Sequence, residues 1–582
     1  MTDFIKNIES KIKEIINSCG YETDTVLLVP SARPDLGDYQ YNGVMSLAKV
    51  YHKNPIEIAN EIVDKLKDIK ELTNVNVAGP GFINVSFTNE ALIEYFENTR
   101  YQELDYSKNE NKKVIIDYGG PNVAKTLHVG HLRSADIGEA LKRLAKRLGY
   151  DVISDVHLGD WGRQMGLVML ELRLMHPEWV FFDENYNGEY PTSLPITKED
   201  LDNLYPIASN KAKEDEQYLE SAREITFKLQ QKEKGYVKLW EILINNSTEY
   251  IKKLYDILNV SFDLWLGESD SANYIDELFE LLESKGLIKD SEGAKIIDVS
   301  NEDDQLEIPP LLLEKSNGAI SYETTDLATI YQRMKDYNPD EIWYVVDKRQ
   351  ELHFTQVFRA AYKSGIVPEN VKLKFIGFGT MNGKDGKPFK TRDGGVMTLE
   401  SLINLVKDET SKKLNDNILE SEKDEVTTDI AVGALKYADL LSDRSTDYIF
   451  DVEKFSDLNG KTGVYLLYST LRMKSLLTKA KESNITDFKI TSINNDIDRN
   501  IYLKLLEVSS NLDKSYNEKS LHDITDFLYE LTNRYNSFYS AFKVLNEENT
   551  SLRDSWLALT EIVYKTNIFL LDILGIKLPK KM

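Results

Sequence analysis

A buried strand, a glycine-rich loop, a helix and a second strand follow one another between residues 114 and 156, and this order constrains the fold more than any other part of the sequence. The run VIIDY at 114–118 is short and apolar, as expected of a buried strand. From about Leu132 to Leu148 apolar residues recur every three or four positions, and Gly149 ends this helical pattern. Because a new strand is expected at 151–156, the segment predicts a β-α-β unit of a parallel, doubly wound sheet.

The remainder of the chain predicts further domains around this sheet. The first hundred residues combine amphipathic helices with a short strand, a later stretch is acidic and helical, and helical patterns dominate the last third. We therefore expect an α/β multidomain protein with a doubly wound parallel-sheet (Rossmann-like) domain. The expected boundaries are 1–105 for a small α+β domain, 106–400 for the sheet domain with a helical insertion at about 178–290, 401–455 for a connecting helical segment, and 456–582 for an all-α domain.

Charge, cysteine content and hydropathy exclude several classes of protein. The chain carries 71 Lys and Arg against 96 Asp and Glu, a net charge of −25, which argues against a protein that coats nucleic acid by bulk attraction. Basic residues nevertheless gather locally, with eight against three acidic ones at 111–150 and five against one at 461–482. One cysteine, Cys19, excludes a disulfide framework and a cysteine-rich zinc site. With no signal peptide and no long apolar run, we expect a cytoplasmic protein and not a membrane protein.

The loop between the first strand and its helix carries the residues that point most directly to chemistry. Ligands of open α/β sheets bind at this end of the strands, and a helix N-terminus attracts anions. His128 and His131 can direct two ring N–H groups toward a phosphate, and Gly130 between them lets a flat ring approach the backbone. Two other interpretations stay open here: a metal-binding pair, which no third nearby histidine supports, and a purely structural turn.

A second segment, 383–395, follows a predicted strand and carries four Lys or Arg residues against two Asp. Such a loop suits polyphosphate, because lysine and arginine stabilise the charge that develops on a leaving group. The alternative interpretation is a solvated basic hairpin without a role in chemistry.

Both segments resemble the signatures of one enzyme family. The string that ends in His-Val-Gly-His resembles the first, "HIGH", signature of class I aminoacyl-tRNA synthetases, and together with HLGDWGRQ at 157–164 it is similar to the arginyl-tRNA synthetases. Further likenesses follow in the family's order: GDY at 37–39, GPGFIN at 79–84, YETTD at 322–326, RQELH at 349–353, ADL at 438–440 through Tyr448, and Gly460 to Arg472. The first signature here comprises Pro121, Asn122, Val123, Ala124, Lys125, Thr126, Leu127, His128, Val129, Gly130 and His131.

The resemblance implies an arginine–tRNA ligase. Such an enzyme activates L-arginine with ATP, whose Mg²⁺ arrives with the nucleotide, and transfers the arginyl group to the 3′ end of tRNA(Arg). It implies a HUP-type catalytic domain, an N-terminal tRNA-binding domain and a DALR-type anticodon-binding domain, with no protein-held metal. We expect a monomer. Two alternatives stay open: a class I synthetase of another specificity, and an inactive RNA-binding paralogue.

The resemblance also implies roles for the phosphate-binding residues. His128, His131 and Gly130 would contact ATP, and three basic residues would hold its outer phosphates. One departure concerns the second signature, Lys-Met-Ser-Lys in other class I enzymes, because this chain has Phe389-Lys390-Thr391-Arg392. Many arginyl enzymes look like this, and a lysine three residues before the first signature histidine is thought to compensate. The basic candidates are therefore Lys125, Lys390 and Arg392.

The arginine pocket is implied in the same way. A guanidinium is a planar fork that pairs well with carboxylates, and the resemblance suggests Asp117 and Asp326 as those partners. Tyr322 and Gln350 would complete the polar shell, and Asn122 would hold the α-amino group. The spacing of Tyr322 and Asp326 places both on one face if the segment is helical.

Contacts with tRNA are expected where aromatic and basic residues mix, because base stacking and phosphate binding need both. The alternative is that the tyrosines among them belong to a helical core. The candidates are Tyr465, Tyr468, Arg472 and Lys474 near the start of the last domain, and Phe82 and Asn84 in the N-terminal domain.

Overall fold

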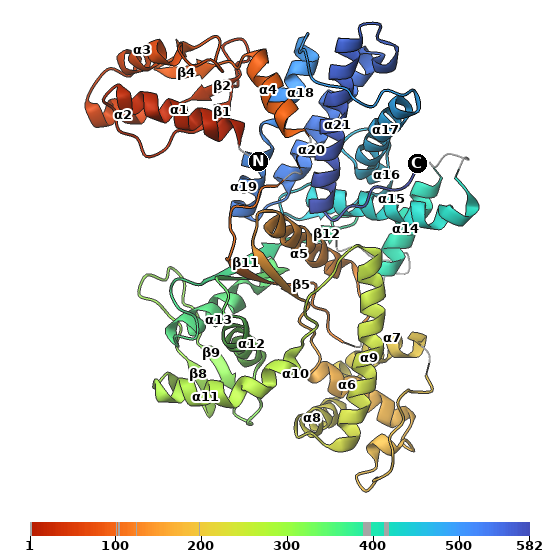
Figure 1. The fold of residues 1–582 in the computed structure, drawn as a ribbon. Helices are drawn as coiled ribbons and strands as arrows, with labels where there is room; N and C mark the ends of the chain where they lie inside the picture. The colour runs from red at the N-terminus through yellow and green to blue at the C-terminus, as the bar shows by residue number, and fades with distance from the viewer. Residues whose placement is uncertain are drawn as a thin grey trace. The chain divides into compact units, whose positions relative to one another are not determined.

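The computed structural model describes residues 3–582 except 101, 103–104, 124, 197, 388–396 and 413–417. No helix within these described residues is both long and apolar enough to cross a membrane. The chain forms two compact units, of which the first contains residues 1–106, 466–518 and 523–571 and the second contains 107–465, 519–522 and 572–582 (Figure 1).

The N-terminal part of the first unit is a four-stranded antiparallel sheet, order β1-β2-β4-β3, with helices. Asp3 caps the first helix, whose buried face repeats every four residues from Phe4 to Ile16. Pro55 is the first residue of the helix that ends at Leu66, and the side chain of Asn54 caps this helix. The elements are α1 (Phe4–Ser18), β1 (Leu28–Pro30), β2 (Tyr39–Tyr41), α2 (Val44–Tyr51), α3 (Pro55–Leu66), β3 (Asn76–Ala78), β4 (Phe82–Val85) and α4 (Asn89–Thr99).

The C-terminal helices complete this first unit. Arg499 forms a bidentate pair with Asp38, with distances of 2.7 and 2.8 Å between guanidinium nitrogens and carboxylate oxygens. The ring centroids of Phe96 and Tyr502 lie 5.0 Å apart. The helices are α17 (Gly463–Glu482), α18 (Asp496–Leu505), α19 (Val508–Glu518), α20 (His522–Ala541), the short 3₁₀ turn η4 (Val544–Asn546) and α21 (Thr550–Ile573).

A four-stranded parallel sheet, order β11-β10-β5-β6, forms the centre of the second unit. The predicted β-α-β unit is confirmed. Its elements are β5 (Lys113–Tyr118), α5 (Val129–Arg147), β6 (Asp151–Asp155), β10 (Glu341–Asp347) and β11 (Lys372–Phe378).

Helices dominate the predicted insertion, and a small antiparallel sheet that the sequence did not predict follows it. That sheet has the order β7-β8-β9. The remaining elements of the unit are α6 (Arg163–Met175), η1 (Val180–Phe182), α7 (Lys198–Glu214), α8 (Glu216–Gln230), α9 (Lys234–Ile257), α10 (Glu268–Ser271), η2 (Ala272–Tyr274), α11 (Ile275–Ser284), β7 (Ile288–Ser291), β8 (Ala294–Ile297), β9 (Leu311–Glu314), α12 (Tyr322–Tyr337), η3 (Lys348–Gln350), α13 (Glu351–Lys363), β12 (Met381–Asn382), α14 (Leu399–Ser411), α15 (Glu420–Leu440), β13 (Tyr448–Ile449) and α16 (Val452–Phe455).

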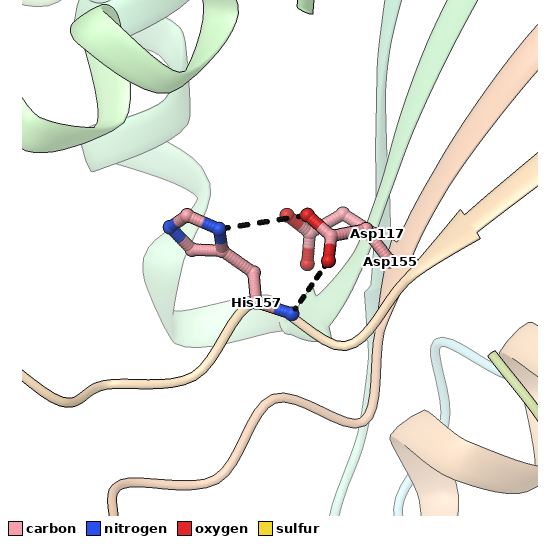
Figure 2. A group of neighbouring side chains, drawn as sticks. All are labelled: Asp117, Asp155 and His157. Atoms are coloured by element: carbon pink, nitrogen blue, oxygen red, sulfur yellow. Dashed lines mark hydrogen bonds and ion pairs between the residues drawn. The ribbon is translucent and has the colours of Figure 1, made fainter. Parts of the chain in front are cut away.

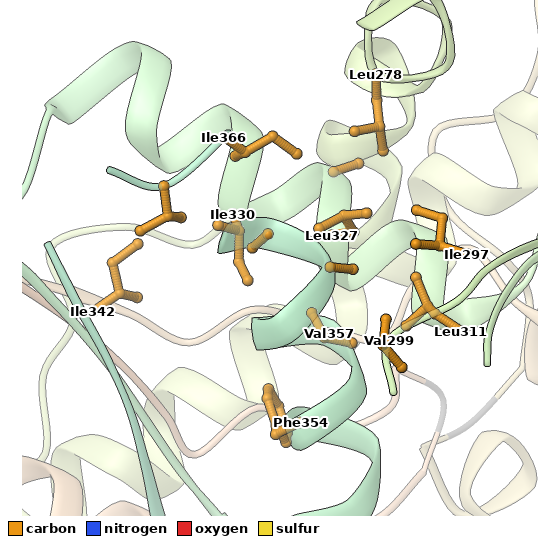
Figure 3. Packing of buried hydrophobic residues seen from close by; sticks show 14 of the residues in the cluster. Leu278, Ile297, Val299, Leu311, Leu327, Ile330, Ile342, Phe354, Val357 and Ile366 are labelled. Atoms are coloured by element: carbon orange, nitrogen blue, oxygen red, sulfur yellow. The ribbon is translucent and has the colours of Figure 1, made fainter. Parts of the chain in front are cut away.

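A buried apolar cluster holds α12 between the parallel sheet and the small sheet (Figure 3). Leu327 and Ile330 of α12 belong to it together with Ile342 of β10, Val357 of α13 and Leu311 of β9, and each is at most 1% exposed. Burial of large aliphatic side chains is the main stabilising contribution at such a junction. The cluster therefore fixes the orientation of α12 and, with it, the position of the polar face of this helix.

Candidate active site

Three strands of the parallel sheet bring candidate residues to the same edge. Asp117 lies near the end of β5, Asp155 ends β6, and Gln350 follows β10 through the short turn η3. Because β5 lies between β6 and β10, the loop after β5 starts where the strand order reverses, which is where ligands of such sheets bind.

The two signature histidines cap the first turn of α5. The Nδ1 atom of His128 accepts from the backbone N–H of Gly130 at 3.0 Å, and Nδ1 of His131 accepts from the backbone N–H of His128 at 3.0 Å. A Cβ on Gly130 would lie 2.8 Å from Cε1 of His128, so glycine admits the ring as predicted. Since Nδ1 is the acceptor in both rings, the proton of each neutral ring belongs on Nε2.

Both histidines are uncharged at neutral pH. Burial and the nearby Lys125 lower the pKa of His128. Burial, followed by the repulsion that a protonated His128 ring would exert, lowers the pKa of His131 to about 3. The two rings therefore have a structural role as caps and also offer neutral Nε2–H donors at a helix end that attracts anions.

Two further signature residues have partners in the helical insertion and α6. The ammonium of Lys125 lies 4.2 Å from the ring centroid of Tyr205. The Oδ1 atom of Asn122 accepts from Nε2 of Gln164 at 3.3 Å. Both side chains are half-buried, so they line the loop instead of extending into solvent.

The basic segment 383–395 is described only in part. Lys390 and Arg392, like Ala124 of the first signature, lie outside the described residues. Just beyond that segment, the backbone N–H of Val129 donates to the carbonyl of Met397 at 3.2 Å. The chain that leaves the basic segment is thus hydrogen-bonded beside the signature histidines.

One face of α12 carries two of the candidate arginine-binding residues. Tyr322, Asp326, Thr329 and Arg333 follow one another at intervals of four, three and four residues, which places them on a single face. The helix expected for Tyr322 and Asp326 is confirmed. A direct bond, 2.5 Å between Nε2 and Oδ2, joins His353 of α13 to Asp326.

Tyr322 and Gln350 are the exposed members of this group. The Tyr322 side chain is 61% exposed, and its ring centroid lies 4.9 Å from that of His353. Gln350 stands at the N-terminus of α13 and is also exposed. Both side chains are therefore accessible from solvent.

Glu268, the first residue of α10, is an acidic group that the sequence did not single out. Burial raises its pKa to about 7, the charge of His157 opposes this, and the negative charges of Asp326 and Asp160 add to it. Asp160 fixes α10 by accepting from the backbone N–H of Ser269 at 3.0 Å and from its hydroxyl at 2.6 Å. No motif marks Glu268, because it stands in an acidic stretch of the helical insertion.

Asp117 differs from the expectation of an open carboxylate. Its Oδ2 accepts from Nη2 of Arg333 at 2.6 Å, and the same nitrogen donates to Oδ2 of Asp155 at 2.8 Å. Figure 2 shows Asp117 beside Asp155 and His157. Arg333 was missed, although its position seven residues after Asp326 on the same helical face could have revealed it.

The candidate tRNA-binding residues of the last domain differ in exposure. Tyr468 is 45% exposed and Lys474 is exposed, whereas Tyr465 and Arg472 are half-buried. The Arg472 guanidinium lies 4.4 Å from the ring centroid of Tyr539.

In the N-terminal domain, the two candidates also differ. Phe82 is half-buried. Asn84 is 1% exposed and donates to Oδ1 of Asn76 at 3.2 Å. Its amide is thus bonded to another side chain of the sheet, and the tRNA contact of Asn84 stays a prediction.

Comparison with known proteins connects this geometry to one family. The model for class I tRNA synthetases (R), catalytic domain, matches residues 96–452. The arginyl tRNA synthetase N-terminal domain matches 6–87, and the DALR anticodon-binding domain matches 466–582.

Relatives match along the whole chain. The arginine–tRNA ligase of Alkaliphilus oremlandii is 44% identical over 584 residues, which cover 99% of each chain, and that of Agathobacter rectalis is 43% identical with full coverage of both. Among solved structures, arginyl-tRNA synthetases of Plasmodium falciparum and Thermus thermophilus share the fold over all of both chains, with TM-scores of 0.81 and 0.80 at 24% and 21% identity. With its signature histidines, its parallel sheet and these matches, the chain belongs to the arginyl-tRNA synthetase family of class I aminoacyl-tRNA synthetases.

Proposed function

We propose that the residues described above carry out the arginine–tRNA ligase reaction in two steps. The carboxylate of L-arginine attacks the α-phosphate of ATP, which forms arginyl-adenylate and releases pyrophosphate. The arginyl group then passes from the adenylate to a ribose hydroxyl at the 3′ end of tRNA(Arg). No enzyme side chain needs to form a covalent bond, so rate enhancement comes from positioning and from stabilising charge. The observation that carries this assignment is that neutral donors at the N-terminus of α5 and a carboxylate held by His353 belong to the same compact unit.

Asp326 and Glu268 are the proposed partners of the substrate guanidinium. Asp326 is held by His353, so its carboxylate is oriented before arginine arrives. Glu268 has a pKa raised to about 7, mainly by burial, and a bound guanidinium would favour its ionised form. Lysine would leave part of this arrangement unpaired, and an unsatisfied buried group costs about 1–3 kcal/mol.

The remaining pocket residues have orienting roles in this proposal. Asn122 holds the α-amino group, while Tyr322 and Gln350 close over the side chain. Asn122 is supported by its half-buried place in the signature loop, where it bonds to Gln164. Tyr322 and Gln350 are supported by their exposure beside Asp326 and His353.

ATP is assigned to the signature loop. His128 and His131 donate from Nε2 to the phosphates, and Gly130 lets the nucleotide and the first ring approach the backbone. Lys125 supplies positive charge to the outer phosphates, with Lys390 and Arg392 as the other basic candidates. ATP enters together with its Mg²⁺, which is part of the substrate.

The domain boundaries, the tRNA contacts and the setting also remain proposals. We assign residues 1–105 to tRNA binding, 106–400 to catalysis with the insertion at about 178–290, 401–455 to a connection, and 456–582 to anticodon binding. Tyr468 is the best-supported tRNA contact because it is exposed for stacking, and Tyr465, Arg472, Lys474 and Phe82 are further candidates. A monomer that works in the cytoplasm, where protein synthesis uses its product, fits the family.

One aminoacylation assay tests the proposal. Purified enzyme is incubated with total tRNA, MgATP and each of several labelled amino acids. We expect label in tRNA from arginine alone. Charging with another amino acid would indicate a different class I specificity, and no charging with any of them would indicate an inactive RNA-binding paralogue.

A further inference from the structure

Arg133 is a buried charged side chain on the helix that carries the signature histidines, and the reaction as described does not use it. It lies on α5, five residues after His128 and two after His131, and is 1% exposed. A charge that is removed from water is tolerated only when partners compensate it. The carbonyls that it binds stand 246 and 313 residues further along the chain, so they indicate which distant segments this side chain holds together.

The guanidinium of Arg133 joins three places at once. Nη1 donates to the carbonyl of Gly379 at 2.7 Å and to the carbonyl of Thr446 at 3.0 Å. Nε lies 3.0 Å from Oδ1 of Asp439, a residue of α15 that is also 1% exposed. The same carboxylate oxygen accepts from the hydroxyl of Tyr448 at 2.8 Å. A planar fork with several donors suits such a junction, whereas the single ammonium of a lysine cannot serve all of it.

The two carbonyls belong to segments that lie in direct contact. A Cβ on Gly379 would overlap the carbonyl oxygen of Thr446, so a larger residue would force the segments apart. The backbone N–H of Gly379 donates to the carbonyl of Arg444 at 2.8 Å, and that of Tyr448 donates to the carbonyl of Thr380 at 3.0 Å. Beyond these bonds, β12 pairs in parallel with β13. Arg133 therefore attaches α5 to the place where these two short strands begin.

This place determines where the chain enters the basic segment 383–395. The strand β12 ends at Asn382, immediately before that segment, and the carbonyl of Asn382 accepts from the backbone N–H of Phe450 at 2.8 Å. Within the segment, Nζ of Lys384 lies 3.2 Å from Oδ1 of Asp451. The entry to the basic segment is thus bonded to β13 and the residues after it, and through Arg133 to the signature helix.

The chain that leaves the basic segment is attached to the same helix by its backbone. The N–H of Val129 donates to the carbonyl of Met397 at 3.2 Å, and the N–H of Leu399 donates to the carbonyl of Leu127 at 2.9 Å. Main-chain bonds therefore hold the exit, whereas a side chain of α5 holds the entry. A substitution of that side chain changes the entry and leaves the bonds of the exit in place.

Arg133 is enclosed and acts on the reaction only through the segments that it holds. The ring centroids of Tyr448 and Phe378 lie 5.0 and 6.0 Å from its Cζ. Burial raises the pKa of Asp439, and the positive charge of Arg133 opposes this rise. The guanidinium is thus used to compensate a buried carboxylate and two backbone carbonyls, and it does not face a substrate.

We propose that Arg133 is a positioning residue that holds the entry of the basic segment at a fixed place relative to His128 and His131, so that both signatures meet the phosphates of one ATP. This rests on the proposed function, which assigns the signature histidines and the basic segment to ATP. Loss of the fork lets the entry move, and a displacement of about 1 Å costs on the order of 100-fold in rate when it misaligns reacting groups. Arginine binding depends on other residues and stays nearly unchanged.

The first test compares two arginine-to-lysine changes on the same helix. Arg133→Lys keeps the positive charge and loses the fork, whereas Arg143→Lys makes the same change where the partners are Glu139 and Asp572. Pyrophosphate exchange is measured in the presence of tRNA, with separate KM values for arginine and ATP. For Arg133→Lys we expect turnover to fall on the order of 10- to 100-fold, a raised ATP KM, and an arginine KM within about threefold of the wild type. Arg143→Lys should resemble the wild type.

The second test measures the attachment itself and does not depend on the reaction. Amide hydrogen exchange is followed in peptides that cover 379–387 and 446–451, in the wild type and in both lysine variants. Opening of a local segment speeds the exchange of its amides. We expect faster amide exchange in these peptides for Arg133→Lys alone, and wild-type rates in a peptide that covers 397–402, because the exit is held by main-chain bonds.

The outcomes separate the inference from the proposed function. Wild-type amide exchange at 379–387 in Arg133→Lys overturns the inference, and so does an arginine KM that rises as much as the ATP KM. A purely structural role would lower the amount of active enzyme and leave both KM values unchanged, which also contradicts it. If the wild type shows no arginine-dependent pyrophosphate exchange, the proposed function fails, and the amide comparison decides whether Arg133 holds the entry.

A milder variant covers the case in which Arg133→Lys does not fold. Tyr448→Phe keeps the ring beside the guanidinium and removes only the hydroxyl that bonds to Asp439. We expect the same pattern with a smaller loss of turnover, about two- to fivefold, as for loss of one hydrogen bond. Wild-type turnover together with wild-type amide exchange at 379–387 in this variant would then reject the inference.

Discussion

The amino-acid side and the ATP side of the site handle charge in opposite ways. On the amino-acid side, carboxylates are fixed by partners before any ligand binds: Asp326 by His353, and Asp117 by Arg333. On the ATP side, His128 and His131 bond to backbone N–H groups through Nδ1, and their pKa values are lowered so that they are neutral.

The difference follows from what each side must recognise. Arginine keeps its positive charge throughout the reaction, so fixed opposite charges can select it at the binding step. The phosphates of ATP are anionic in the ground state, and charge moves onto the leaving group only during reaction. Fully charged histidines would bind not only the transition state but also ATP and pyrophosphate tightly. Binding that is equally strong in the ground state and the transition state does not raise turnover. Neutral, oriented donors limit this uniform binding.

The largest expected effect tests the neutral donors. His131→Asn keeps an acceptor that can replace Nδ1 opposite the His128 N–H but lacks the Nε2–H donor. We expect turnover in pyrophosphate exchange to fall about 10²–10³-fold, a usual range for loss of a transition-state donor, while the arginine KM changes little. The assay includes tRNA. Full turnover in His131→Asn would mean that His131 serves only as a cap.

The next effect tests the fixed charges and their pH dependence. Burial raises the pKa of Glu268 to about 7, so the free enzyme holds this group partly protonated at neutral pH. If Glu268 is a partner of the substrate guanidinium as proposed, arginine binds its ionised form, and the arginine KM should fall as the pH rises through 7. Glu268→Gln should raise the KM at pH 8 by about tenfold or more and flatten its pH profile. Parallel profiles for the two enzymes would assign the titration to another group.

A smaller effect is expected from the residue that holds Asp326. His353→Gln can still donate to the carboxylate, whereas His353→Leu cannot. We expect the arginine KM to rise by about three- to tenfold in the leucine variant, as for loss of one hydrogen bond, and less in the glutamine variant. ATP KM is the internal control. Equal losses in both variants would indicate that ring packing against Tyr322, and not the hydrogen bond, matters.

The mildest test changes no residue. The chain has seven histidines, few enough for each ring to be followed by NMR as the pH changes. His157 should stay protonated until about pH 9, because a raised pKa keeps the charged form up to that value, and His131 should stay neutral down to about pH 3. If both titrate near 6.5, the proposed contrast between the two sides is wrong.

Local sequence signals predicted the framework of the site well. Sequence patterns predicted the apolar strand at 114–118, the helix after it and the strand at 151–156. They could do so because strands and helices differ in the period of their apolar residues, and because glycine marks where the segments end. The sequence also predicted that Gly130 leaves room for a histidine ring. It predicted that Tyr322 and Asp326 share one face if their segment is helical, as it is. The small sheet β7–β9 was not predicted, since its short strands carry charged residues among the apolar ones.

The ion pairs of Arg333 and the burial of Glu268 could not be predicted in this way, because the partners lie far apart in the chain. Asp117 and Arg333 are separated by 216 residues and Asp155 and Arg333 by 178. No local sequence pattern indicates whether the carboxylate of an aspartate is accessible or already bonded to another side chain. Burial of Glu268 likewise depends on Asp160 fixing α10, which folding alone brings about.

The sequence by itself determined the fold class, the signature loop and the family, because these depend on periodicity and on motifs that are contiguous in the chain. Tertiary structure decided the electrostatic state of the residues. The pKa of His131 and that of His157 move in opposite directions from the same ordinary value, since one ring is buried near positive charge and the other is buried between carboxylates. Long-range contacts likewise decide which partner each aspartate has, Arg333 for Asp117 and His353 for Asp326.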